Sequence, residues 1–219
     1  MSSRDRDYWR RLVSREEYAL VLDFMPRGNP TDHHHPSHRE RPIAQAIGCR
    51  YFTLLEFHPK PGVDVAIGEK LYVGFSRREL RDKVSFVWGE PILYDDLTSI
   101  AKSNLPTAIQ SIVLELEKEF TTFFNIAQPL TIKLHMLELI PGVGKKTLWV
   151  ILEERSREPF KNFADIRNRV KGFDPQKAVV ERILSELRGS ERYYLFVHPP
   201  RNVATAVFLD CLSKLYGEK

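Results

Sequence analysis

The chain has 219 residues, of which 42% are hydrophobic and 28% charged, a balance that suits one large globular domain or two small ones. Its 33 Lys and Arg residues against 29 Asp and Glu residues give a formal net charge of +4, which favours a polyanionic partner only weakly. No segment approaches the ~18 consecutive apolar residues of a membrane span, so we expect no membrane partner.

The start of the chain and its cysteines point to a reducing compartment. The charged stretch MSSRDRDYWRR lacks the apolar segment of a secretory signal. Cys49 and Cys211 form no CxxC pair and are too few for a disulfide framework, so we expect two buried, reduced thiols. These features predict a cytoplasmic protein.

The first half reads as β structure. Residues 1–15 are polar and basic, and we predict a mobile arm, with an RNA-contacting tail as the alternative. Short runs rich in apolar and aromatic residues predict four strands, at 16–26, 44–59, 70–75 and 83–93. Gly48 implies a bend or bulge within the second of them. Short strands without intervening helices predict a small barrel or a sandwich, and a barrel would remove the exposed strand edges.

The segment RGNPTDHHHPSHRERP (27–42) is predicted to be a long loop. A His-rich tract suggests a metal site, but adjacent histidines in a loop do not form a tetrahedral site in advance. No Cys, Asp or Glu pair has ligand spacing nearby, so we predict no metal. Contact with phosphate or protein through the histidines, Arg39 and Arg41 is the preferred interpretation, with binding strengthened below pH ~6.5 as the imidazoles become charged.

The second half changes to helical periodicity. Apolar residues at spacings of three and four over 94–120 predict a helix, and we expect Pro106 to divide it in two. Helices are predicted onward to about residue 189. The fold class is therefore α+β, with two domains: an N-terminal OB-like barrel and an all-α domain. The predicted boundaries are a barrel at 16–95, connecting helices at 96–128, a helical domain at 129–190, and a C-terminal strand with an amphipathic helix at 191–219.

The stretch LELIPGVGKKTLWVIL contains a glycine turn between two predicted helices, at 134–140 and from about Gly144 onward. We expect Gly142 and Gly144 to adopt positive φ. The first N–H groups of the second helix lack partners within the helix, so with the helix dipole they form an anion site. The predicted nucleic-acid contacts are Gly142, Val143, Gly144, Lys145, Lys146 and Thr147.

This stretch resembles the helix–hairpin–helix motif, which binds the backbone of DNA or RNA without reading its sequence. Trp149 is bulkier than the small residue often found near that place in the motif. A weaker copy follows over 163–187, with a turn at Lys171–Gly172 and Asp174–Pro175 in place of a second glycine. The resemblance implies that the second copy is structural and that both copies share one apolar core. The alternative is that both glycine turns are only tight corners.

Further segments widen the resemblance. YALVLDFMPRG, PIAQAIGCRYFTLLEF, YDDLTSIAKSNLP and PFKNFADIRNRV, with the hairpin, resemble the archaeal domain-of-unknown-function 655 family over about residues 16–197. The resemblance implies an OB-like barrel joined to a helix–hairpin–helix domain, and RNA binding in translation or transcription. Such barrels bind single strands through basic and aromatic side chains. The predicted barrel contacts are Arg50, Lys70, Arg77 and Arg78, together with Arg39 and Arg41.

No motif for catalysis is found: the sequence has no Walker loop, no GxSxG and no recognisable Cys/His nucleophile. We therefore expect a non-catalytic RNA-binding protein associated with ribosomal RNA or the translation apparatus, without a cofactor. Two alternatives stay open. The motif permits a DNA repair or processing factor, and it permits an interaction scaffold that binds ribosomal or other translation proteins.

Overall fold

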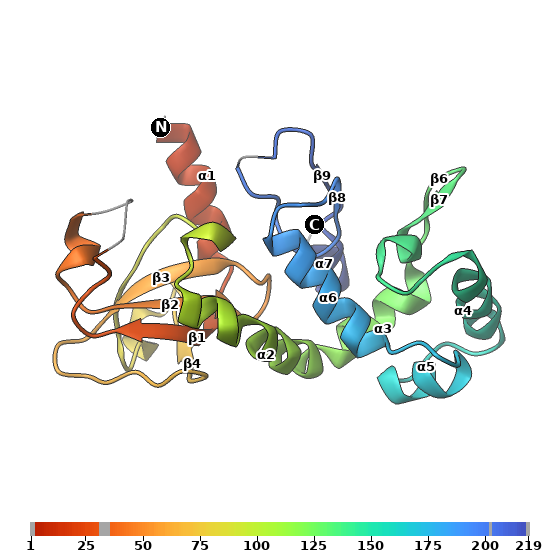
Figure 1. Cartoon of the computed structure of the whole chain (residues 1–219), viewed down its shortest axis with the longest axis horizontal. Coiled ribbons are helices and arrows are strands. Elements are labelled where there is room, and N and C mark those ends of the chain that lie inside the picture. The colour runs from red at the N-terminus through yellow and green to blue at the C-terminus, as the bar shows by residue number, and fades with distance from the viewer. Residues whose placement is uncertain (1–2, 31–35, 202, 218–219) are drawn as a thin grey trace. The chain divides into compact units, whose positions relative to one another are not determined.

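The computed structural model describes residues 3–30, 36–201 and 203–217 (Figure 1). The chain forms two compact units, Met1–Ala108 and Ile109–Lys219. The division falls within helix α2 (Ser99–Glu115), inside the segment that the sequence analysis assigned to connecting helices. The first unit contains the main sheet, and most of the helical residues lie in the second, so the fold is mixed α/β.

The first unit is built on one antiparallel sheet of five strands. They are β1 (Tyr18–Met25), β2 (Ile43–Gly48), β3 (Leu54–Pro59), β4 (Lys70–Tyr72) and β5 (Val84–Val87). Their order is β4-β1-β2-β3-β5, so β4 and β5 are the two end strands. The sheet curls as a half-barrel, and no ladder joins its ends within the described ranges. The first unit therefore has the curvature predicted for a barrel, but its sheet is a half-barrel whose ends stay unpaired among the described residues.

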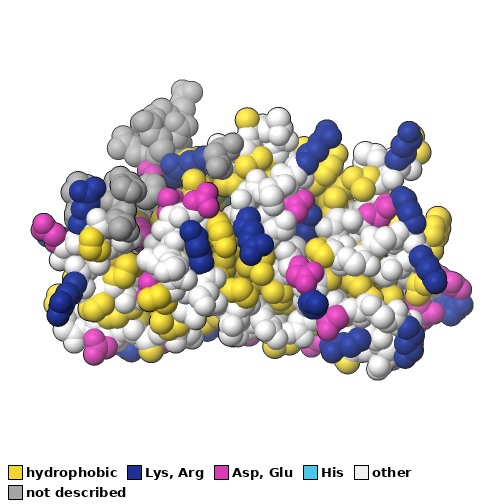
Figure 2. Space-filling model, in the orientation of Figure 1, with side chains coloured by type: hydrophobic (Ala, Val, Ile, Leu, Met, Phe, Trp, Pro, Cys, Tyr) yellow, Lys and Arg dark blue, Asp and Glu magenta, His cyan; other side chains and the backbone are white. Residues whose placement is uncertain are grey.

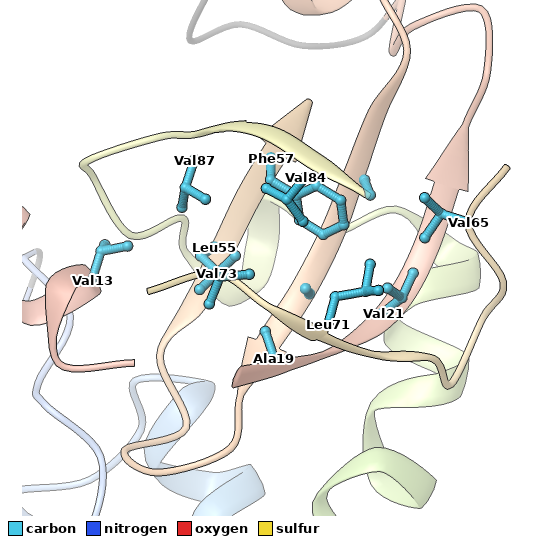
Figure 3. Close-up of a cluster of buried hydrophobic side chains, with 12 residues drawn as sticks. Val13, Ala19, Val21, Leu55, Phe57, Val65, Leu71, Val73, Val84 and Val87 are labelled. Atoms are coloured by element: carbon cyan, nitrogen blue, oxygen red, sulfur yellow. The ribbon is translucent and has the colours of Figure 1, made fainter. Parts of the chain in front are cut away.

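Apolar side chains from all five strands fill the inside of the curl (Figure 3). Val21, Phe57 and Val73 are each no more than 1% exposed. Val84 and Val87 of β5 point into the same cluster, and Val13 joins it from outside the sheet (Figure 3). This burial of apolar surface from both end strands stabilises the curl without a closing ladder.

The predicted strand at 44–59 was wrong as a single element, because it forms two strands joined by a reversal at 49–53. The carboxylate of Glu16 holds this reversal by accepting the N–H groups of Arg50 (2.9 Å), Tyr51 (3.0 Å) and Thr53 (3.1 Å). Phe52 adopts a positive φ of 58° inside it. Burial raises the pKa of Glu16, opposed by these N–H donors. Gly48, at the end of β2, indicates a bend here, but the turn itself has no Gly, Pro or Asn to mark a full reversal.

The predicted arm at 1–15 is instead helical, because α1 spans Ser3–Ser14. Trp9, Leu12 and Val13 have the spacing of one helix face, and Val13 is fully buried in the cluster of the sheet. Six charged residues between 4 and 11 hide this stripe in the sequence. Burial of Val13 therefore ties the end of the segment to the fold.

The first unit also has three short 3₁₀ turns among its described residues, η1 (Pro36–Arg39), η2 (Arg78–Leu80) and η3 (Tyr94–Asp96).

The predicted break at Pro106 was wrong, since Pro106 lies inside α2 and the chain turns at Leu116 instead. Proline fits helical φ and removes one hydrogen bond. Buried residues on one face of α2, including Leu105, Ile109 and Ile112, offset that loss.

The second unit contains most of the helices and two short strand pairs. Its helices are α3 (Glu117–Ile126), η4 (Met136–Leu139), α4 (Lys145–Arg157), α5 (Phe163–Arg169), α6 (Pro175–Leu187) and α7 (Cys211–Leu215). Antiparallel β6 (Pro129–Thr131) and β7 (Leu134–His135) form one pair, and parallel β8 (Tyr193–Tyr194) and β9 (Val207–Phe208) form the other. The expectation of an all-α domain therefore needs correction for these strands.

Three local predictions in this unit also need correction. The segment 134–140 is a strand end followed by one 3₁₀ turn, because His135 caps that turn through its side chain. Among the described residues of the C-terminal helix predicted at 204–219, only α7 is helical, since Val207 and Phe208 pair with β8. Among the described residues of the strand predicted at 192–202, only β8 is a strand.

Two further expectations concern membranes and thiols. Within the described ranges, every helix is too short or too polar to cross a bilayer. Cys49 and Cys211 are both thiols outside any disulfide; Cys211 is buried as expected, whereas Cys49 is only half-buried. Burial raises the pKa of Cys211 to about 12, so this thiol stays protonated at neutral pH.

Candidate nucleic-acid interface

The first glycine turn connects η4 to α4. Gly142 adopts φ +82°, and the N–H of Val143 donates to the carbonyl of Ile140 at 3.0 Å. Gly144 is the N-cap of α4 with φ −83°, so the prediction of positive φ is confirmed at Gly142 and wrong at Gly144. The helix begins at Lys145, where the sequence predicted it. Gly142 therefore supplies the positive φ that the turn needs, whereas the role of Gly144 is to leave the space at the start of α4 free of a side chain.

The second glycine turn repeats this backbone between α5 and α6. Gly172 adopts φ +79°, and the N–H of Phe173 donates to the carbonyl of Val170 at 3.2 Å. Asp174 takes the N-cap position of Gly144. A Cβ on Gly142 would lie 3.7 Å from the Phe173 ring, so the two turns lie side by side. Most of the apolar residues predicted for a shared core are buried: Leu137, Ile140, Leu148, Ile151, Ile166, Val170, Val179, Ile183 and Leu187.

The two turns differ in their helix caps. The carboxylate of Asp174 accepts the N–H of Lys177 at 3.1 Å, so α6 supplies its own anion. Gly144 has no side chain to cap α4, and no heavy atom lies within 4 Å of where its Cβ would be. The first N–H groups of α4 therefore have no capping side chain at the positive end of the helix dipole.

The two lysines after Gly144 have different surroundings. The Nζ of Lys145 lies 2.6 Å from Glu138 Oε1 and donates to the carbonyl of Lys133 at 3.3 Å. The hydrogen bond from Lys145 to Glu138, together with a second one from the N–H of His135, lowers the pKa of Glu138. Lys146 is exposed, and its side chain makes no ion pair within the described ranges. Lys146 therefore offers its full charge, whereas Lys145 must share its charge with Glu138.

His135 ties the stability of this turn to pH. Its Nδ1 accepts the N–H of Leu137 at 3.1 Å, which requires the neutral ring. Burial, followed by the nearby charge of Arg155, lowers the pKa of His135 below its ordinary value of 6.5. Because the unfolded chain takes up the proton first, the stability contributed by neutral His135 is complete above pH ~6.5 and is lost as the pH falls through the folded pKa.

Urea denaturation at pH 7.5 and 5.0 should show a larger loss in the free energy of unfolding for the wild type than for His135→Asn. Equal losses would contradict this linkage.

Exposed apolar side chains flank the lysines. Trp149 is 68% exposed and lies one helical turn beyond Lys145 and Lys146, and Ile132 is fully exposed between β6 and β7. Figure 2 shows Lys and Arg side chains over the β6–β7 pair and the start of α4. The surface around the first turn thus combines positive charge with a large exposed ring.

The basic residues predicted on the first unit do not form one patch. Arg50 lies 5.6 Å from the Tyr51 ring in the turn after β2, and Lys70, on β4, lies 5.7 Å from the ring of Tyr18 on β1. Arg77 is 3.9 Å from Glu17. Arg39, Arg41 and Arg78 are exposed, and Arg41 and Arg78 line hollows beside β5.

The histidine loop divides at the limit of the described residues. His33, His34 and His35 lie outside them. His38 is fully buried, with Nδ1 3.3 Å from Glu56 Oε2. The predicted contact of this histidine with the phosphate of a ligand is therefore wrong. Over residues 3–30, 36–201 and 203–217, no three His, Cys, Asp or Glu side chains gather closely enough to hold a metal ion.

Sequence reasoning missed Lys133, His135 and Glu138 as parts of this surface. All three precede the turn, and His135 and Glu138 lie on the segment 134–140, which was predicted to be a helix face. Glu138 and Lys145 are seven residues apart, and only the reversal at Gly142 brings them together. No local pattern predicts such a pair. The only sequence signal is an acidic residue close before a Gly-x-Gly-Lys stretch, which indicates a carboxylate near the first lysine once the chain reverses.

Known proteins share this chain's fold and sequence. Residues 15–198 match the family described as "Protein of unknown function (DUF655)". The chain belongs to this family. The uncharacterized protein MJ0038 of Methanocaldococcus jannaschii is 39% identical over 184 residues, which are 83% of this chain and 80% of that protein. The crystal structure of Af1531 from Archaeoglobus fulgidus is 43% identical with a TM-score of 0.73, covering 84% of this chain and 100% of that one. The DUF655 resemblance is therefore confirmed, with archaeal relatives.

Proposed function

We propose that this DUF655 protein is a non-catalytic RNA-binding protein that grips a phosphate at the first glycine turn, in association with ribosomal RNA or the translation apparatus. The observation that carries the proposal is the uncapped start of α4, with Gly144 open to solvent and Lys146 beside it. A phosphate there would accept several N–H groups and meet the positive end of the helix. Of the other predicted contacts, Gly142 is exposed and Thr147 is half-buried, whereas Val143 is 4% exposed and its N–H donates to the carbonyl of Ile140.

The second turn supports this assignment by contrast. Both turns share one backbone, but Asp174 fills at α6 the position that stays empty at α4. A purely structural pair would gain from a capping side chain in both places, since a Ser, Thr, Asp or Asn cap stabilises a helix. Glycine at an N-cap is only a few tenths of a kcal/mol weaker than these residues, so it is the open cap together with the exposed Lys146 beside it that favours a ligand. In this proposal the two turns are a tandem helix–hairpin–helix, of which only the first binds.

The proposal also gives the first unit a role. The strand order β4-β1-β2-β3-β5 leaves consecutive strands at the two ends of a curl, as in a partly open barrel. We take it as an OB-like barrel that accompanies the hairpins. The choice of RNA over DNA rests on the family resemblance drawn from the sequence. A DNA repair or processing factor, or a scaffold for translation proteins, are the outcomes against which RNA is tested.

A double charge reversal tests the phosphate grip. Lys145→Glu/Lys146→Glu should weaken binding of a labelled ribosomal RNA fragment by roughly ten-fold or more, and reduce the slope of log affinity against log salt by about 1 to 2. The matched control is Lys171→Glu/Lys177→Glu at the second turn, which changes the net charge equally and should bind nearly as the wild type does. An equal loss of RNA affinity in both double variants would mean that net charge, and not the first turn, determines binding.

Crosslinking in cells identifies the natural ligand. Sequencing of nucleic acid recovered with the wild type should return discrete ribosomal RNA segments, and those contacted by the first turn should be depleted in Lys145→Glu/Lys146→Glu. Recovery of DNA would overturn the assignment to RNA and favour a repair or processing factor. Recovery of neither nucleic acid above background would leave the protein scaffold.

A further inference from the structure

A groove runs along β5, the end strand of the sheet in the first unit. Its central hollow has a volume of about 850 Å³ and is lined by Phe75, Arg78, Phe86 and Trp88. A second hollow shares Phe86 and Trp88 and continues past Arg41, and a third continues from Phe75 and Arg78 toward α1. Adjoining hollows of this size accommodate more than one nucleotide-sized group.

A bulge turns Phe86 into this groove. His58 of β3 pairs with Phe86, but the next residue, Pro59, pairs with Val84, so Ser85 is an extra residue on β5. Regular alternation would place Phe86 on the same side as Val84. Instead Val84 and Val87 point into the core (Figure 3), whereas Phe86 is 50% exposed. Bulges commonly re-aim a side chain in this way beside a functional site.

The exposed ring rests on a fixed support. Phe86 meets Trp88 edge to face, with centroids 5.2 Å apart and an interplanar angle of 83°. Trp88 in turn packs against the buried ring of His38, with centroids 4.5 Å apart. Phe86 is therefore pre-oriented, and a flat ligand that stacks on it would order few additional side chains.

The walls of the groove are mainly positive. Six basic residues line its three hollows against two acidic ones, Glu79 and Glu90; the basic residues are Arg10, Arg11, Arg41, Lys60, Arg78 and Arg81. Arg81 is held by the carbonyls of Val73 and Gly74, so it belongs to the frame. The other basic side chains lie on both sides of the aromatic centre. Flat apolar rings flanked by positive charge suit a chain that alternates bases with phosphates.

We propose that this groove binds a single-stranded RNA segment, with one base stacked on Phe86 and the backbone phosphates against Lys60, Arg78 and Arg41. The choice of RNA rests on the function proposed above, whereas the site itself rests on the groove. Arg41 and Arg78 were predicted barrel contacts and lie here; Arg50, Lys70 and Arg77 line none of the three hollows. The binding site of the first unit is thus the edge strand β5.

An unstructured ligand and a disabled hairpin isolate the groove. Fluorescence anisotropy would follow labelled oligouridine of about twelve nucleotides binding to full-length Lys145→Glu/Lys146→Glu protein. In that background Phe86→Leu should weaken binding by about ten-fold, because leucine keeps apolar surface and removes the stacking face. Phe86→Trp should retain binding. Ile67→Ala, which changes an equally exposed residue (51%) outside the groove, should leave binding unchanged.

Each outcome decides between the two sites. Binding by the hairpin variant that Phe86→Leu reduces supports the groove, whatever becomes of the first turn. Equal binding by Phe86→Leu and the hairpin background would overturn the groove, and so would the absence of oligouridine binding in that background. Equal or tighter binding of oligodeoxythymidine would overturn the choice of RNA. An acidic peptide that displaces oligouridine and tolerates Phe86→Leu would assign the groove to a protein partner.

Discussion

Gly144→Asp is expected to stabilise the second unit slightly while weakening RNA binding by roughly 100-fold. Gly144 has φ −83°, which any residue can adopt, and its Cβ position is open. The new carboxylate would accept an N–H of α4, as Asp174 does at α6. A stabilisation of a few tenths of a kcal/mol follows from replacing Gly by Asp at an N-cap.

The same carboxylate would block the phosphate. It would occupy the N–H groups that the phosphate needs and add a negative charge beside Lys145 and Lys146. Loss of two hydrogen bonds to a charged group, at about 1.5 kcal/mol each, corresponds to roughly two decades in affinity. Stability and binding therefore move in opposite directions, which damage to the fold cannot produce.

Two measurements on the same protein check this result. Thermal melting of Gly144→Asp should match or exceed that of the wild type, and titration with ribosomal RNA should show the loss. Asp174→Gly is the control, because it removes the cap of α6 and should leave RNA affinity nearly unchanged. A Gly144→Asp protein that binds RNA as the wild type does would remove the start of α4 from the interface.

Sequence patterns anticipated the parts of the fold that local chemistry determines. The Gly-x-Gly stretch predicted a turn and the start of α4, because Gly142 needs positive φ and helix periodicity resumes at once. Short runs rich in apolar and aromatic residues predicted strands at the places where the sheet has them, although β2 and β3 were merged into one predicted strand. The lysines of the candidate site follow directly from that turn.

Long-range contacts set the features that the sequence did not reveal. The reversal at 49–53 depends on the carboxylate of Glu16, more than thirty residues earlier in the chain. The exposure of Phe86 depends on a bulge that its own strand does not encode. The pairing of Lys145 with Glu138 needs the turn to be in place first. Such contacts leave no periodic signal, so they appear only in three dimensions.

Glu186→Ala is expected to destabilise the second unit by about 3 to 5 kcal/mol. The fully buried Glu186 carboxylate accepts the N–H groups of Leu195, Phe196 and Val197 at 2.7 to 2.9 Å. It also accepts Nε of Arg182 at 2.7 Å. Burial raises the pKa of Glu186, while Arg182 and the three N–H groups oppose that rise. Alanine would leave three buried donors unpaired and most of the Arg182 charge uncompensated.

A second carboxylate on the same arginine gives the matched control. Glu191 lies 3.1 Å from Arg182 but is 28% exposed, so Glu191→Ala should cost no more than about 1 kcal/mol. Urea denaturation compares the two variants, and hydrogen exchange at Leu195, Phe196 and Val197 localises the loss. Because Arg182 also donates to the carbonyls of Leu139 and Tyr193, Glu186→Ala should loosen η4 beside the first turn. Similar costs for both variants would mean that burial does not decide the strength of this cluster.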